Sequence, residues 1–117
     1  MMILRLKMIK KQFKIEIYQT IVTIILDKDL SYVEKKYKTK SLKDYSAVTL
    51  KYENKYRNYV VAFTDKDHLS NIAHEIVHLI NYIYLDFGIE LDRVNDENQA
   101  YLSGYLFDKI YNILNKK

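Results

Sequence analysis

Residues 68–86, HLSNIAHEIVHLINYIYLD, decide the fold of the C-terminal half of this chain. Apolar side chains recur there every three or four residues, and polar side chains occupy the opposite face. Asp65 to Asp67 introduces the segment and Gly88 breaks the pattern, so we predict one long amphipathic helix over about 68–86. Its predicted apolar stripe consists of Leu69, Ile72, Ala73, Ile76, Ile80, Ile83 and Tyr84.

A second helix is predicted after a loop that runs through Asp92. Asn95 is a suitable N-cap residue, and the helical spacing of apolar side chains continues to about Leu114. The loop over 86–94 allows the two helices to form an antiparallel pair, and Gly104 is expected to let them approach closely. The apolar stripe of this second helix consists of Leu102, Leu106, Phe107, Ile110, Ile113 and Leu114.

Upstream, residues 13–26 are rich in β-branched side chains and predict two strands. Tyr18-Gln19-Thr20 is expected to bend or turn the chain between them. A short helix is predicted over about 30–38, with Asp29 or Ser31 as its N-cap.

A hairpin is predicted next, with strands over 46–53 and 57–64 and a turn at Asn54-Lys55. Residues 1–12 are expected to form a loose N-terminal arm or the start of the first strand. Because strands come first and two helices last, we predict a single α+β domain over 1–117, a small sheet with the helices packed on it.

The composition excludes several classes of function. With 117 residues, 49% of them hydrophobic, the chain can bury one core. The absence of Cys excludes disulfide scaffolds, Cys-based zinc fingers and thiol catalysis, and two Gly residues are too few for a Gly-rich phosphate loop. With no export signal and no membrane-spanning apolar run, the sequence predicts a cytoplasmic protein.

Charge is unevenly distributed: residues 1–57 carry a net charge of +8 and residues 58–117 carry −4. A basic half is compatible with contact to nucleic acid, but no nucleic-acid-binding motif accompanies it, so a solvated lysine-rich surface is the favoured interpretation.

The motif that carries chemistry is His74-Glu75-Ile76-Val77-His78, HExxH on the first predicted helix. Two His four residues apart project from one helical face and can bind one metal ion together. Glu75 lies about 100° further round the helix, beside the ion, where a carboxylate can take a proton from an activated water. The alternative is two surface His and an exposed Glu on a solvated face.

A catalytic zinc ion usually takes three protein ligands. His68 lies six residues before His74 and on another face of the helix, so it is a poor third ligand. Glu97, separated from His78 by eighteen residues, sits in the first turn of the second helix, opposite that helix's apolar stripe. It is the favoured third ligand, with Asp96 as the competing oxygen ligand; the alternative for Glu97 is a favourable charge at a helix N-terminus.

HExxH followed by a Glu on the next helix resembles the gluzincin branch of zinc metallopeptidases, which includes thermolysin. Glu97-Asn98-Gln99-Ala100-Tyr101 resembles the ExxA pattern of ImmA/IrrE-type peptidases, and residues 74–106 resemble small HExxH proteins of bacteriophages and prophages. The resemblance covers about residues 57–107. It implies a small zincin-like domain with Zn²⁺ held by His74, His78 and Glu97, and with Glu75 as the general base.

The sequence departs from thermolysin-like enzymes at Tyr101, where those enzymes have an Asp, and in lacking a large second domain. Tyr101 shares a helical face with Glu97 and is a candidate to donate a hydrogen bond to a ligand or to a developing oxyanion. Asn71 and Tyr82 flank the His pair and are candidates to line a cleft.

The expected function is therefore that of a phage- or prophage-encoded zinc-dependent metallopeptidase that hydrolyses a peptide or protein substrate, for example a host factor. Residues 57–64 are predicted to be the edge strand on which an extended peptide pairs. The alternative is a zincin-fold module that binds zinc and a host or phage protein without proteolysis.

Overall fold

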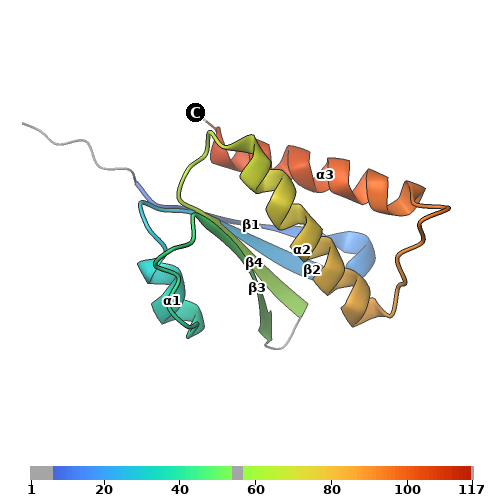
Figure 1. The fold of residues 1–117 in the computed structure, drawn as a ribbon, viewed down its shortest axis with the longest axis horizontal. Helices are drawn as coiled ribbons and strands as arrows, with labels where there is room; N and C mark the ends of the chain where they lie inside the picture. The colour runs from blue at the N-terminus through green and yellow to red at the C-terminus, as the bar shows by residue number, and fades with distance from the viewer. Residues whose placement is uncertain (1–6, 54–56, 117) are drawn as a thin grey trace, which may run out of the picture.

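Four strands form one mixed sheet with helices on both faces in the computed structural model, which describes residues 7–53 and 57–116 (Figure 1). The prediction of an α+β domain is confirmed at this level. The predicted turn at Asn54-Lys55 lies outside the described residues. In chain order the elements are β1 (Ile9–Ile15), the short 3-10 helix η1 (Glu16–Tyr18), β2 (Thr20–Leu26), α1 (Ser31–Tyr37), β3 (Ala47–Glu53), β4 (Arg57–Phe63), α2 (Leu69–Phe87) and α3 (Glu97–Leu114).

The strands lie in the order β1-β2-β4-β3, and β4 pairs parallel with β2 and antiparallel with β3. The prediction that residues 57–64 form the edge strand is therefore wrong, because β4 is an interior strand and β3 lies at the edge. Burial explains this arrangement. The consecutive residues from Tyr59 to Phe63 are all buried, as expected for a strand that is covered on both faces and flanked on both edges.

The two faces of the sheet carry two separate apolar clusters. The larger cluster lies under α2 and α3 and includes Phe63 of the sheet, Ile72 of α2 and Ile110 of α3. The smaller one joins Val33 of α1 to the opposite face of the sheet. Figure 1 shows α1 on one side of the strands and the α2–α3 pair on the other. Within the described ranges, no helix is both long and apolar enough to cross a membrane.

The structure upstream of α2 can be compared with the prediction at three places. Gln19 adopts a left-handed conformation with φ of 48° between η1 and β2, so the predicted bend at residues 18–20 is confirmed. The N-cap of α1 is Leu30 rather than Asp29 or Ser31, and Asp29 instead accepts hydrogen bonds from the backbone N–H and the hydroxyl of Ser31. β1 begins at Ile9, so residues 9–12 form the start of the first strand, which is one of the two alternatives predicted for residues 1–12.

α2 and α3 form within one or two residues of their predicted ends. The apolar stripe of α2 differs from the prediction, because Leu79 is buried whereas Leu69 is 48% exposed and Ala73 is also exposed. The N-cap of α3 is Asp96 rather than Asn95.

The two glycines serve different purposes. Gly88 ends α2 in a left-handed conformation with φ of 65°, which glycine adopts without a steric penalty. At Gly104, a Cβ atom would meet no atom within 4 Å. The expectation that Gly104 permits a close helix approach is therefore wrong, since open space surrounds that position.

Candidate metal centre

His74 and His78 converge on one point at the surface of α2. Their Nε2 atoms are 3.2 Å apart, and both side chains are exposed, that of His74 by 68%. Two nitrogen ligands at 2.0–2.1 Å from a tetrahedral zinc ion stand about 3.3 Å apart. The pair therefore fits two positions of a zinc shell, and the same distance also suits an N–H···N hydrogen bond between the two rings.

Glu75, by contrast, is buried, with only 5% of its surface exposed. The hydroxyl of Thr49 in β3 donates a hydrogen bond to Glu75 Oε1 at 2.7 Å. The second oxygen, Oε2, lies 4.0 Å from His74 Nε2. One carboxylate oxygen is thus fixed to the sheet while the other faces the histidine pair.

The backbone of β3 is open along the edge beside this motif. Ser46 and Thr64 stand directly opposite each other, and Thr64 N–H donates to the Ser46 carbonyl at 2.9 Å. In an antiparallel pair the hydrogen-bonded positions alternate, so Ala47 and Thr49 direct their backbone N–H and C=O groups away from β4. Among the described residues, no further strand follows β3 at that edge.

A second polar contact holds the far end of α2 on the same strands. Asp86 accepts a hydrogen bond from Lys51 Nζ of β3 at 2.5 Å and another from the Tyr59 hydroxyl of β4. Burial, reinforced by the hydrogen bond to Asp86, raises the pKa of Tyr59 well above its ordinary value. Burial also acts to raise the pKa of Asp86, but the hydrogen bonds from Lys51 and Tyr59 outweigh it and lower that pKa.

Of the two residues predicted to flank the pair, Asn71 contacts the residue before β3 and Tyr82 contacts β4. Asn71 Nδ2 lies 3.5 Å from Ser46 Oγ, and the ring of Tyr82 stacks on that of Tyr59 with centroids 6.2 Å apart. Together with Glu75 and Asp86, these residues form the β3 flank of α2, the side of the helix that faces the open edge of the sheet.

The structure does not bring Glu97 to the histidine pair. Across residues 7–53 and 57–116, no group of three or more His, Asp or Glu side chains could hold a metal ion. Glu97 and the competing Asp96 lie exposed at the start of α3, at the opposite end of α2 from its first turns (Figure 1).

Two features of the fold account for this separation. α2 continues for about nine residues beyond His78, which is about 13 Å of helix, before the chain turns back. In addition, α3 lies over the β1–β2 half of the sheet, where its Tyr105 meets Phe13 of β1. The β3 flank of α2, with Glu75, is the other side of that helix.

The remaining predicted residues also lie apart from the pair. Tyr101 is 75% exposed and lines a shallow groove beside η1 together with Ile17 and Tyr18. His68 precedes the first turn of α2, with its Nδ1 3.1 Å from Asp65 Oδ2. The alternating pattern places Thr49 on a strand but does not predict its hydrogen bond to Glu75. That bond joins residues 26 positions apart in the sequence.

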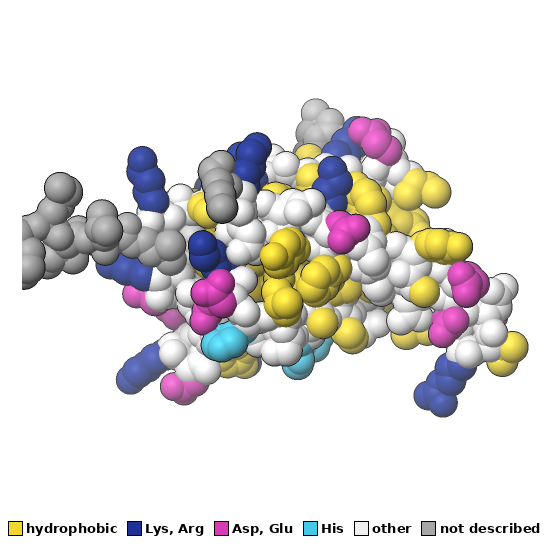
Figure 2. Space-filling view, turned by 90° about the horizontal axis from the view of Figure 1, so that it is seen from above, with side chains coloured by type: hydrophobic (Ala, Val, Ile, Leu, Met, Phe, Trp, Pro, Cys, Tyr) yellow, Lys and Arg dark blue, Asp and Glu magenta, His cyan; other side chains and the backbone are white. Residues whose placement is uncertain are grey.

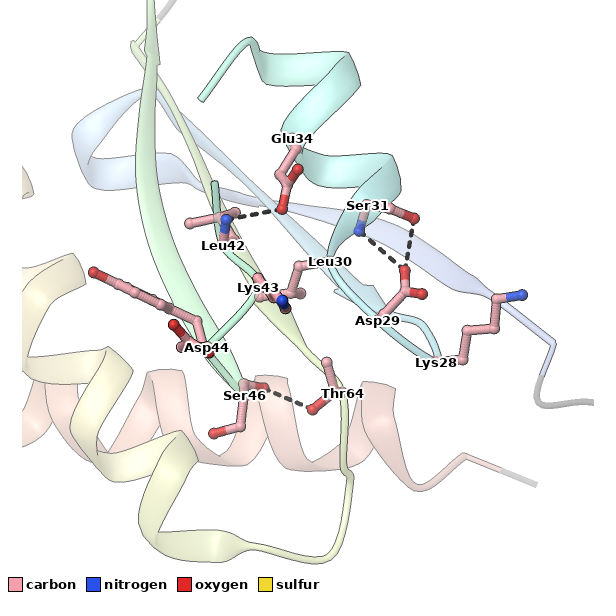
Figure 3. Close-up of a pocket in the computed structure, with 11 residues that line it drawn as sticks. Lys28, Asp29, Leu30, Ser31, Glu34, Leu42, Lys43, Asp44, Ser46 and Thr64 are labelled. Carbon is pink, nitrogen blue, oxygen red and sulfur yellow. Dashed lines mark hydrogen bonds between the residues drawn. The ribbon is translucent and has the colours of Figure 1, made fainter. Parts of the chain in front are cut away.

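A larger hollow of about 490 Å³ lies between α1 and the loop that leads into β3 (Figure 3). Its polar walls are already hydrogen-bonded to each other. Glu34 accepts from the Leu42 N–H at 2.8 Å, and the Thr64 hydroxyl donates to the Ser46 carbonyl at 3.0 Å. These bonds fix the loop before β3 and therefore help to hold Thr49 in place.

Comparison with family models, curated proteins and solved structures gave no match to this chain.

Proposed function

We propose that this chain is a zinc-dependent metallopeptidase-like protein in which His74 and His78 bind the ion and Glu75 is the general base. The observation that carries the proposal is the asymmetric placement of Glu75 beside the pair. One of its oxygens is held by Thr49 at 2.7 Å, and the other faces His74 Nε2 at 4.0 Å. A positioned carboxylate next to two converging imidazoles is suited to proton transfer at a metal site.

A zinc ion bound at such a site supplies Lewis acidity and makes water a stronger acid. The chain's own residues then have distinct tasks. Glu75 Oε2 accepts a proton from the attacking water and passes it to the leaving amine, while Thr49 keeps the carboxylate oriented. The outward backbone groups of Ala47 and Thr49 can pair with an extended peptide as an added strand.

The test combines metal analysis with hydrolysis of a mixed peptide library read by mass spectrometry. The purified chain should bind zinc, and both His74→Ala and His78→Ala should lose it. Glu75→Gln should retain zinc and lower the hydrolysis rate by about 10²-fold or more, because only the proton acceptor is removed. Hydrolysis that Glu75→Gln leaves unchanged would contradict the mechanism.

A zinc-binding module without hydrolysis is the second candidate. It is favoured by the finding that the described residues place no third carboxylate or imidazole beside the pair. This candidate predicts that zinc raises the melting temperature of the chain, with no peptide turnover in the library and no effect of Glu75→Gln on zinc content.

A further inference from the structure

The histidine pair is an incomplete zinc site that faces solvent. Two imidazole nitrogens stand at a suitable separation of 3.2 Å, yet the described residues of the same chain add no third ligand. Zinc sites in proteins take three or four protein ligands. A ligand from outside the chain would complete the shell, and the exposure of both histidines leaves room for one to approach.

An exposed carboxylate, a group that can bind zinc, lies where the connection between α2 and α3 meets the start of α3. We call residues 90–97 the acidic tip, because Glu90, Asp92, Asp96 and Glu97 gather there with Arg93. Asp92 Oδ1 accepts the backbone N–H groups of Val94 at 2.9 Å and Asn95 at 3.2 Å, so the backbone of the tip is internally fixed. Glu97 is exposed, and in the described structure its carboxylate makes no hydrogen bond or ion pair.

Exposed apolar side chains accompany both surfaces. On the tip, Val94 is 95% and Leu91 is 52% exposed. On α2, Val77 lies within the HExxH motif and is 57% exposed, and Leu69 is 48% exposed. Figure 2 shows histidine side chains at the surface near hydrophobic ones, and hydrophobic and acidic side chains side by side at the right-hand end of the molecule. Contact between the two surfaces would remove this apolar area from water.

We propose that a second copy of this chain supplies the third zinc ligand, with Glu97 of one copy completing the His74–His78 pair of the other. The inference rests on the proposed function, since it takes zinc as the ion. Each copy has one histidine pair and one acidic tip, so a two-fold dimer can form both contacts at once and hold two ions. The tip's negative charge complements a cation bound at the histidine pair.

The experiment measures the mass and the zinc content of the full chain by analytical ultracentrifugation and native mass spectrometry, with and without added Zn²⁺. We expect monomers in chelator and dimers with two zinc ions when Zn²⁺ is present. His74→Ala and Glu97→Ala should each abolish both dimer and bound zinc. Glu90→Gln, at another exposed carboxylate of the tip, is the matched control and should leave dimer and zinc content unchanged.

The decisive measurement is made on a mixture of the His74→Ala and Glu97→Ala variants, each of which is expected to lose the dimer and the bound zinc on its own. In a heterodimer, the intact His pair of the Glu97→Ala copy meets Glu97 of the His74→Ala copy, so one of the two sites is restored. We therefore expect the 1:1 mixture to regain dimers that hold one zinc ion each. Monomers with one zinc ion per chain, and no gain on mixing, would overturn the dimer while leaving the proposed function in place. No zinc uptake under any condition would overturn both.

Discussion

The two flanks of α2 are held by different kinds of contact. On the β3 flank, Glu75 and Asp86 are tied to the sheet by hydrogen bonds from Thr49, Lys51 and Tyr59. The other flank packs on α3, whose buried side chains are all aliphatic: Leu106, Ile110 and Leu114.

This difference separates orientation from stability. Hydrogen bonds fix direction within narrow limits but contribute only about 1 kcal/mol each to folding, whereas a buried aliphatic side chain contributes about 2 kcal/mol or more. The polar flank therefore orients Glu75, and the apolar flank holds the helix pair together. Substitutions on the two flanks should accordingly have different consequences.

The largest effect is expected on the apolar flank. Ile110 is fully buried in the larger cluster, so Ile110→Ala should lower the free energy of unfolding by about 2–5 kcal/mol through lost burial and a residual cavity. Urea denaturation measures this loss. Zinc content measured well below the lowered melting temperature should match that of the unmodified chain, and a specific loss of zinc in the folded variant would contradict the separation of roles.

A smaller stability loss, with a specific chemical consequence, is expected on the polar flank. Thr49→Val keeps the shape but removes the donor to the buried Glu75 carboxylate, which should reduce stability by about 1–3 kcal/mol. The kcat of any peptide hydrolysis should be lower in this variant, because the Glu75 carboxylate is no longer held in orientation.

Thr49→Ser retains a hydroxyl and is the matched control. It should restore most of the hydrolysis rate and part of the stability. A Thr49→Ser variant with a hydrolysis rate as low as that of Thr49→Val would contradict the role assigned to the hydrogen bond, because a hydroxyl at this position would then not be sufficient to orient Glu75.

The smallest effects are expected at the two glycines, and they should have opposite signs. Gly88→Ala places a side chain at a φ of 65° and should destabilise the chain by about 1 kcal/mol. Gly104→Ala adds a Cβ in open space within an exposed helical turn, so it should stabilise by about 0.5–1 kcal/mol. Thermal unfolding of both variants measures these shifts. Destabilisation by Gly104→Ala would mean that α3 is packed more tightly at this position than the structure indicates.

The local pattern was sufficient to locate most elements and the HExxH motif. The alternation over 46–53 and the helical period over 68–86 depend only on neighbouring residues, and both elements form where expected. The pattern could not identify the edge strand, because an edge is defined by what lies beside it. β2 pairs with β4, far along the chain, and this pairing moves residues 57–63 to the interior.

The candidate site shows the same limit. His74 and His78 converge because residues four apart share a helical face, which requires no tertiary contact. Whether Glu97 lies beside the two histidines depends on the length of α2 and on the side of α2 against which α3 packs. Both features depend on which apolar side chains of the helices are buried against the sheet. In the resulting arrangement, Glu97 lies apart from His74 and His78.

The sequence by itself determined the helical repeat that carries HExxH, the ends of α2 and α3 to within about two residues, and the convergence of the two histidines. All of these follow from local backbone geometry and from the spacing of apolar side chains. The tertiary structure alone decided that β3 is the open edge, that Thr49 holds Glu75, and that Glu97 lies at the far end of α2. These depend on which distant apolar surfaces bury one another, and burial is a property of the assembled chain.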